Sequence, residues 1–308
     1  MPLVKVQSRG TQNVGGGRKN LIINGAMEVA QRGTSASSKT ASDYYTCDRW
    51  RTEASGATFN TSQQSNTASD MATTGAKHFL RMEVTTANNN SGISQKIEAK
   101  NIRQFKGEKL TLSFYAKGTN PNGGSFDVVR QFDDGSASST QEKSSLTVTS
   151  SFVKYTYTFD YPDEGSVTMT DANAKLALSF LQPDGDSSTN AWTLDITSVQ
   201  LEVGEQATSF EHRSLGEELA LCQRYYQKFG SGSYWGFQAK TTDTSRQVQG
   251  MLPTEMRATP TLETSGWRSG YSFTATNFLG TSYFNFYSLA GDTTSHILLT
   301  DWNLEAEL

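Results

Sequence analysis

The residue types that most often carry catalysis are scattered along this sequence. The three histidines, His78, His212 and His296, lie in unrelated segments. The sequence has no His-x-x-x-His or Cys-x-x-Cys spacing for a metal and no Gly-x-Ser-x-Gly turn for a nucleophile. We therefore find no constellation that predicts metal-assisted or nucleophilic chemistry, and we expect no cofactor.

Paired carboxylates are the other arrangement with catalytic potential. They occur at Asp133-Asp134 and at Asp184-x-Asp186, in polar segments that contain glycine. A glycosidase needs two carboxylates facing each other across a cleft, whereas neighbours in a turn are typical of solvated loops. The sequence thus predicts a protein that is not an enzyme.

Aromatic residues offer a better case for binding. In the run 283–287, alternation places Phe284 and Phe286 on one face and Tyr283, Asn285 and Tyr287 on the other. Sugars are held by aromatic faces together with amide or carboxylate hydrogen bonds. The candidate receptor- or glycan-binding residues are Tyr283, Asn285, Tyr287, Trp235 and Trp267. The alternative is that both faces are buried, one of them at a subunit interface.

Composition limits the class of protein. The 308-residue chain has 19% charged and 11% aromatic residues and a net charge of −4. A net negative charge without a basic stripe argues against nucleic-acid binding. No apolar run is long enough to span a membrane, and the N-terminus lacks the apolar core of a signal peptide. Cys47 and Cys222 are too few and too far apart for a disulfide framework, and we expect two buried thiols.

The elements that would position these residues are mostly strands. Residues 20–208 contain many short alternating segments separated by turns, which predicts one β-sandwich or jelly roll. In one segment Val153, Tyr155, Tyr157 and Phe159 share a face. In the last, around residues 193–203, the alternation changes register, which indicates a β-bulge. Tyr44, Tyr45 and Trp50 are expected in the core or in inter-domain packing rather than in contact with a ligand.

A short helix is predicted to follow in the connector, residues 209–230. Ser214 can cap it, and Glu217 completes a capping box. Its apolar residues have heptad spacing, which predicts a seam on an oligomer axis: Leu215, Leu219, Cys222, Tyr226 and Phe229. Beside Glu211, His212 and Arg213 suggest either a ring of ion pairs or a solvated hinge, and the hinge is favoured.

The two ends of the chain complete the predicted organisation. Residues 1–19 carry a glycine triplet and few core residues, which predicts either a flexible arm or attachment segment or a disordered tail. Residues 231–308 predict a second, smaller β-domain in which prolines flank the segment 254–259.

Four stretches of the chain resemble tail-fibre and virion-appendage proteins of tailed bacteriophages. They are NLIINGAMEVAQRGTS…YYTCDRW, ITSVQLEVG…ATSFEHRSLGEELALCQRYYQKF, MLPTEMRATPTL and the terminal LEAEL. They occur over nearly the whole chain. The resemblance implies that the N-terminal arm docks to the particle and that the protein is made in the host cytoplasm and carried in the virion.

The first domain also resembles jelly-roll carbohydrate-binding modules. NLIINGAME, GEKLTLSFYAKGT, SFVKYTYTF and ITSVQL correspond to its opening, two inner and closing strands. Members of that family often hold a structural calcium with carboxylates. Here Ala26, Thr197 and Ser198 stand at such positions, Glu28 remains, and Asp195 is two residues out of register. Because Ca²⁺ needs several oxygen ligands with negative charge, we expect the fold without the metal.

These observations together predict an all-β virion protein: an arm, a jelly-roll β-sandwich, a short helix and a small β-domain. We expect a homotrimeric tail fibre that contributes to adsorption through host-surface glycans, by multivalent binding. Its other partners would be tail or capsid proteins. The alternatives are a purely structural virion component, such as a capsid decoration, collar or tail connector, and a soluble carbohydrate-binding module.

Overall fold

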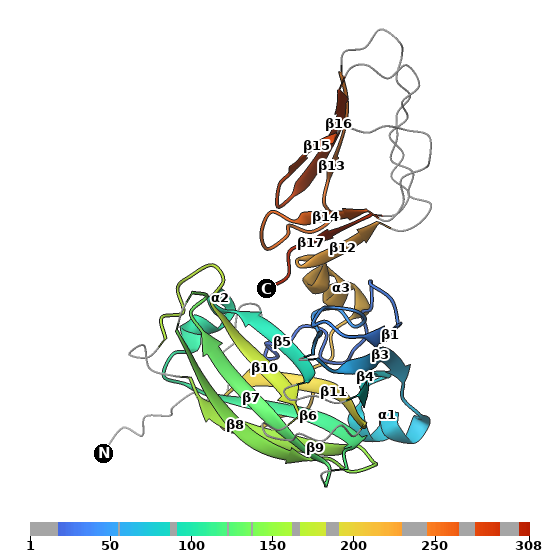
Figure 1. Ribbon diagram of the computed structural model, residues 1–308. Helices are drawn as coiled ribbons and strands as arrows, with labels where there is room; N and C mark the ends of the chain where they lie inside the picture. The colour runs from blue at the N-terminus through green and yellow to red at the C-terminus, as the bar shows by residue number, and fades with distance from the viewer. Residues whose placement is uncertain are drawn as a thin grey trace, which may run out of the picture. The chain divides into compact units, whose positions relative to one another are not determined.

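The structure, a computed structural model, describes part of the 308-residue chain. The described residues are 18–54, 56–86, 91–121, 123–136, 138–161, 167–182, 191–229, 245–264, 275–289 and 302–308. They form two compact units. The first runs to Ser214 and includes Leu308, and the second covers Leu215–Glu307. Both consist mainly of strands, with a few short helices (Figure 1). The predicted all-β class is confirmed.

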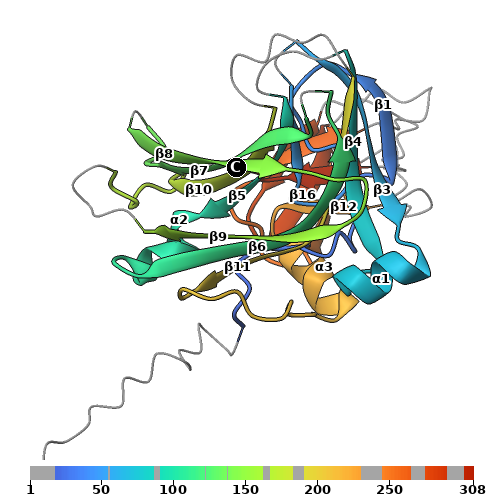
Figure 2. The ribbon, with the colours of Figure 1, turned by 90° about the horizontal axis from the view of Figure 1, so that it is seen from below.

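The first unit is a two-layer β-sandwich. Its strands are β1 (Ser35–Lys39), β2 (Arg51–Glu53), β3 (Thr58–Ser65), β4 (His78–Thr86), β5 (Gly92–Glu98), β6 (Lys109–Thr119), β7 (Ser125–Asp133), β8 (Ser139–Thr147), β9 (Val153–Asp160), β10 (Lys175–Leu181) and β11 (Trp192–Val203). One sheet has the order β1-β3-β4-β11-β6-β9 and the other β2-β5-β10-β7-β8. Neighbouring strands are antiparallel. Figure 2 shows the two layers facing each other, with β8 and β9 on the same side.

The sandwich core follows from the alternation of apolar residues. Along β6, Leu110, Leu112, Phe114 and Ala116 are fully buried. Aromatic rings join the two sheets: Phe114 and Phe180 lie edge to face with centroids 4.7 Å apart. Such edge-to-face pairs stabilise a core beyond the area that they bury.

The predicted bulge lies in β11. The pairing of β11 with β6 shifts between Thr197 and Gln200, and Ser198 has a φ of 50°. The shift lets Leu194 and Ile196 before it and Val199 and Leu201 after it all point into the core. This confirms the change of register read from the sequence.

Short helices interrupt the sandwich, and the sequence analysis did not predict them. They are α1 (Ala68–Thr74), α2 (Ala99–Ile102) and the 3-10 turn η1 (Arg103–Phe105). Thr67 caps α1 by accepting a hydrogen bond from the backbone N–H of Asp70, and Gly75 ends it in the left-handed conformation. A threonine before and a glycine after a helix are common end signals. No helix in the described part of the chain has the length and apolarity that crossing a membrane requires.

The second unit begins with α3 (Leu215–Gln223) and contains two three-stranded sheets. The sheet β12-β17-β14 pairs β12 (Tyr226–Phe229) and β14 (Thr261–Thr264) with β17 (Trp302–Glu305). The sheet β13-β16-β15 consists of β13 (Ser245–Met251), β16 (Tyr283–Leu289) and β15 (Ala275–Leu279). The core of the second unit contains Leu252, Met256, Phe284, Trp302, Leu304 and Ala306. The motifs MLPTEMRATPTL and LEAEL therefore supply core residues of this unit.

Candidate functional site

Only part of the predicted receptor patch lies within the described residues. In β16, Phe284 is buried against Trp302, and Tyr283 is 39% exposed on the other face. The predicted alternation is thus confirmed for these two residues. Asn285 is half-buried. Tyr287 lies in β16 with its side chain outside the described residues, where Trp235 and Trp267 also lie.

Tyr283 belongs to a small apolar surface of the second unit. Its ring packs so closely on Gly280 that a Cβ on this glycine would lie 2.3 Å from a ring carbon. Across the ladder, Tyr283 pairs with Met251, whose exposed fraction is 73%. The site has one aromatic face and the half-buried Asn285 beside it, which is too few polar groups to define the orientation of a sugar.

The heptad seam predicted for the connector is wrong in its second half. The helix α3 ends at Gln223, and Tyr226 and Phe229 lie in β12. Phe229 stacks on Trp302 with centroids 3.9 Å apart, and Tyr226 is buried. Of the remaining seam residues, Leu215 is 59% exposed, Leu219 is half-buried and Cys222 is buried. Because the first three seam residues lie in a helix and the last two in a strand, the five cannot form one continuous helical stripe.

The segment around His212 is not the solvated hinge that the sequence favoured, and the ring of ion pairs between copies of the chain stays a prediction. The carboxylate of Glu211 accepts hydrogen bonds from the backbone N–H groups of Lys19 and Asn20, at 3.1 and 2.8 Å. The Arg213 guanidinium donates to the backbone carbonyls of Ile22, at 2.8 Å, and Asn20. These contacts fasten the end of the first unit to the start of its described chain. His212 itself is exposed and lies edge to face with Phe210.

Two tyrosines form an aromatic platform at the side of the sandwich where β8 and β9 are edge strands of the two sheets (Figure 2). Tyr155 and Tyr157 both stack on Phe114, with interplanar angles of 25° and 15°. One ring face of each is therefore used by the core. Both residues remain half-exposed, so solvent reaches the rest of each ring.

The platform is held rigidly between the two sheets. The Tyr155 hydroxyl donates to the backbone carbonyl of Thr147 at 2.6 Å, and the Tyr157 hydroxyl donates to that of Ser145 at 2.9 Å. Burial raises the pKa of both phenols, and for Tyr157 the neighbouring Tyr155 raises it further while Arg130 lowers it. The phenols are thus neutral and fixed, which leaves flat apolar rings with little rotamer entropy to lose on binding.

Polar groups from the facing sheet lie next to this platform. The inward positions of β8 include Glu142 and Ser144, which pair with Arg130 and Val128 of β7. Arg130 is almost fully buried, with an exposed fraction of 5%. It donates to Ser144 Oγ at 3.0 Å and to Glu142 at 3.4 Å, and its guanidinium lies 5.3 Å from the centroid of Phe159.

Aromatic rings with an adjacent carboxylate, hydroxyl and guanidinium are the chemistry that holds a sugar. We call Tyr155, Tyr157, Arg130, Glu142 and Ser144 the seam site. The sequence analysis assigned the two tyrosines to the face shared with Phe159 and assigned no role to the other three residues. The missed signal is β8, STQEKSSLT, which places mainly polar residues at inward positions.

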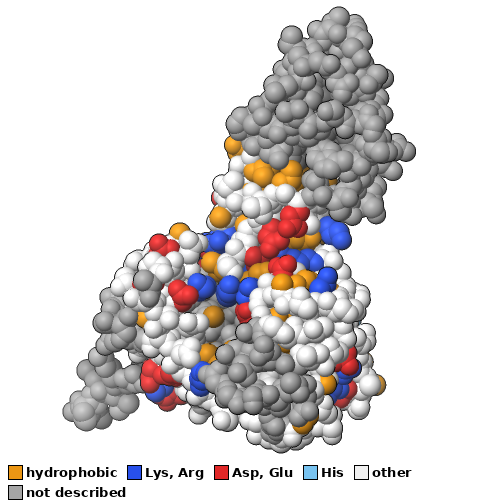
Figure 3. Space-filling view, viewed as in Figure 1, with side chains coloured by type: hydrophobic (Ala, Val, Ile, Leu, Met, Phe, Trp, Pro, Cys, Tyr) orange, Lys and Arg blue, Asp and Glu red, His pale blue; other side chains and the backbone are white. Residues whose placement is uncertain are grey.

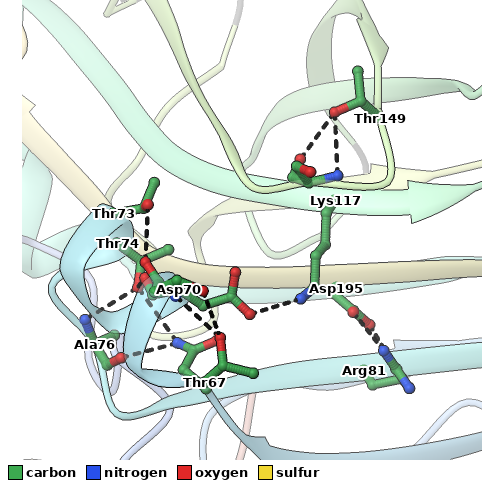
Figure 4. Close-up of polar contacts among 12 residues, drawn as sticks. Thr67, Asp70, Thr73, Thr74, Ala76, Arg81, Lys117, Thr149 and Asp195 are labelled. Atoms are coloured by element: carbon green, nitrogen blue, oxygen red, sulfur yellow. Dashed lines mark hydrogen bonds and ion pairs between the residues drawn. The ribbon is translucent and has the colours of Figure 1, made fainter.

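A second polar cluster lies on the outer face of the six-stranded sheet (Figure 4). The Asp195 carboxylate, with a side-chain exposed fraction of 2%, accepts two hydrogen bonds from Arg81, at 2.8 and 2.7 Å. Lys117 pairs with Asp70 of α1 at 3.2 Å. Its ammonium also lies 4.2 Å from the centroid of Phe152. Burial raises the pKa of Asp195, and the hydrogen bonds and charge of Arg81 only partly offset this.

The structure explains why the residues do not fit the calcium of the similar carbohydrate-binding modules. Asp195 is neutralised by Arg81. Thr197 donates to the backbone carbonyl of His78, and Ser198 to that of Thr74. Hydroxyls that donate to carbonyls replace the anionic oxygens that a hard cation needs. Among the described residues, no group of three potential metal-binding side chains comes together.

Of the two carboxylate pairs, Asp133-Asp134 lies where the chain leaves the end of β7. Asp133 pairs with Lys175 at 2.8 Å. Burial raises the pKa of Asp133, but hydrogen bonds from Lys175 and the Gly135 N–H outweigh it and leave the pKa below its ordinary value. Asp134 accepts hydrogen bonds from the N–H groups of Ser136 and Ser138. Asp184 and Asp186 lie outside the described residues.

Charges of both signs are mixed on the surface of the first unit. In Figure 3 its acidic and basic side chains lie among uncharged ones. Both cysteines are buried and free of disulfides, as predicted.

Comparison with known proteins gives limited similarity. The sequence matches no protein-family model, and no curated relative matches it. Among solved structures, it is similar to the enzymatically active domain of bacteriophage CBA120 tailspike protein 4, with 14% identity and a TM-score of 0.37. That match covers 60% of this chain and 21% of the tailspike chain.

Two carbohydrate-binding domains are similar over most of their own length. The CBM22-2 xylan-binding domain of Paenibacillus barcinonensis Xyn10C has 14% identity and a TM-score of 0.35, covering 51% of this chain and 92% of that one. TmCBM61, solved in complex with β-1,4-galactotriose, has 10% identity and a TM-score of 0.33, covering 61% and 100%. With such identities and TM-scores, these similarities support no conclusion about what this chain binds.

Proposed function

We propose that this chain is a non-enzymatic phage virion protein, a trimeric tail fibre that contributes to adsorption by binding host-surface glycans through its β-sandwich. The seam site carries the glycan part of this proposal. Its two tyrosine rings, each stacked on Phe114, offer a surface for the apolar face of sugar rings. Glu142 and Ser144, which the buried Arg130 holds in place, offer polar groups to the hydroxyls. A ligand of at least two sugar units would cover both rings.

The virion part of the proposal rests on the resemblance of the four sequence stretches to phage appendage proteins. Adsorption would depend on several weak sites held together, because linked sites gain affinity through effective concentration. The trimer no longer has a heptad helix to support it, so its test is direct. Light scattering on the purified chain should give three times the mass of 33.7 kDa, and a monomer would refute the trimer.

Glycan binding is tested with substitutions in the platform. The full chain is applied to an array of bacterial-surface oligosaccharides, and the affinity for each bound glycan is measured for wild type, Tyr155→Ala and Tyr157→Ala. Loss of a stacking ring should weaken binding about tenfold or more, or about 1.4 kcal/mol.

The matched control is Tyr115→Ala. Tyr115 is a half-exposed tyrosine on β6, directly opposite Lys154 of β9, and it points to the outer face of the same sheet. It should leave affinity unchanged. Equal binding by all variants would refute the seam site. An array on which the wild type binds no glycan would refute glycan binding and favour the purely structural role.

A further inference from the structure

A cavity at one end of the sandwich lies apart from the seam site. Its volume is about 190 Å³, and its walls include Glu98, Lys100 and Arg103 on one side and Met169, Thr170 and Asp171 on the other. The first wall belongs to β5, α2 and η1. The helix α2 is found at this end of the sandwich in Figure 1.

The walls of the cavity are fixed by the core. Ile102 and Phe105, which flank Arg103 in α2 and η1, are buried. The backbone N–H of Ala99 donates to the carbonyl of Ala174 at 2.9 Å, which joins the helix to the segment that forms the opposite wall. A cavity with such anchored walls is largely formed before a ligand arrives, as ligand sites usually are.

The lining carries two acidic and two basic side chains, and one of the two cations makes no ion pair among the described residues. The buried Glu98 carboxylate pairs with Lys100 at 3.0 Å. Asp171 Oδ1 accepts the N–H of Asn173 at 2.7 Å, which orients this carboxylate and leaves its second oxygen as an acceptor. Arg103 is exposed, and its guanidinium makes no ion pair with another residue that the structure describes.

We propose that this cavity binds one sugar acid, a pyranose that carries a carboxylate. The guanidinium of Arg103 matches a carboxylate in shape and charge and can donate two parallel hydrogen bonds to it. Asp171 and Thr170 supply an acceptor and a hydroxyl for the ring hydroxyls, and the buried thioether of Met169 faces the apolar side of the ring.

The size of the cavity sets the length of the ligand. The cavity has a volume of about 190 Å³. Pockets for larger organic ligands start at about 300 Å³. The cavity therefore accepts a single sugar ring, whereas the seam site offers two tyrosine rings. This inference does not depend on the proposed virion function.

The test is a titration of the full chain with glucuronate and with glucose, followed by ligand-observed NMR. Glucuronate should bind and glucose should bind at least about tenfold more weakly, or by about 1.4 kcal/mol, because glucose cannot make the charge-assisted hydrogen bonds to Arg103. Arg103→Gln should remove this preference. Lys106→Gln, an exposed cation of the next turn that does not line the cavity, should keep it.

Each outcome decides the matter. Equal binding of glucose and glucuronate, an Arg103→Gln variant that binds glucuronate like wild type, or no binding of glucuronate at all would overturn the proposal. Tyr157→Ala should leave glucuronate binding unchanged, so a failure of the seam site is distinguished from a failure of this cavity.

Discussion

Replacing Arg81 by methionine should destabilise the sandwich more than replacing the buried carboxylate that Arg81 serves. Asp195 is almost fully buried, whereas the Arg81 side chain is 40% exposed. Arg81→Met leaves a buried carboxylate without its two hydrogen bonds, at a place that water hardly reaches. Asp195→Asn removes the buried charge and leaves an arginine that water can solvate.

The magnitude follows from this asymmetry. Breaking a buried ion pair from one side costs about 3–5 kcal/mol. Because the guanidinium is partly exposed, solvent already screens the pair, and we expect a smaller cost than this range, about 2–3 kcal/mol, for Arg81→Met. For Asp195→Asn we expect about 1 kcal/mol, since one hydrogen bond to the amide oxygen can remain.

The pH dependence gives the sharper test. The pKa of Asp195 in the folded protein lies above its ordinary value of 3.8. A raised carboxyl pKa means that the folded state binds the proton more readily than the unfolded state does. The ionised carboxylate therefore lowers stability above the folded pKa, and this penalty fades as the pH falls through it. Without Arg81 the pKa rises further, so the cost of Arg81→Met should shrink as the pH falls from neutral.

The assay is urea unfolding of each variant at neutral and at mildly acidic pH, followed by fluorescence of the buried tryptophans Trp50 and Trp192. The control is Lys109→Met, which breaks the exposed pair of Lys109 with Asp160 and should leave the free energy of unfolding unchanged. The reasoning is refuted if Asp195→Asn costs more than Arg81→Met, or if the cost of Arg81→Met does not depend on pH.

Three further substitutions test single contacts of the first unit by thermal unfolding. Gly118→Ala should cost about 1–3 kcal/mol, because a Cβ there would lie 2.1 Å from the Thr193 carbonyl oxygen of the next strand; an unchanged melting temperature would contradict this. Tyr157→Phe should cost about 1 kcal/mol through the lost hydrogen bond to Ser145 while keeping the ring for a glycan. Arg213→Lys should cost about 1–2 kcal/mol, because an ammonium cannot reproduce the guanidinium contacts with two backbone carbonyls; wild-type stability of either variant would show that solvent replaces these bonds.

Much of the sandwich could be predicted because its strands alternate cleanly. Leu176, Leu178 and Phe180 of β10 are all fully buried, as period-2 alternation requires. The bulge in β11 was visible as a break in the same alternation. These features are local, so they can be recognised in the sequence before the order of the strands in the sheets is known.

The connector shows where a local pattern fails. Its apolar spacing fits a heptad from Leu215 to Phe229, yet the chain leaves the helix after Gln223. Tyr226–Phe229 pairs instead with Trp302–Glu305, more than seventy residues later in the sequence. Long-range ladders override local propensity, and two heptads of spacing contain no information about such a partner.

The candidate sites could not be predicted for a related reason. Tyr155 and Tyr157 have the alternation of core residues, and their partial exposure follows only from β9 being an edge strand. Arg130 occupies an inward-facing position of β7, where the alternation would favour an apolar residue. The cavity combines residues around 100 with residues around 170, which meet because β5 and β10 are neighbours in one sheet.

The seam site lies where the sequence departs from the apolar alternation that the core of a β-sandwich requires. An edge strand whose inward positions are mainly polar, such as β8, contributes little apolar burial and would leave the sandwich open along β9. The two tyrosine hydroxyls close that side by bonding to the β8 backbone, and leucine at both positions would close it with more apolar contact and no exposed ring. Local conflicts with the pattern of a fold are more often functional than accidental. A seam that had only to stabilise the sandwich would therefore be expected to be apolar, and its polar and aromatic composition favours a ligand.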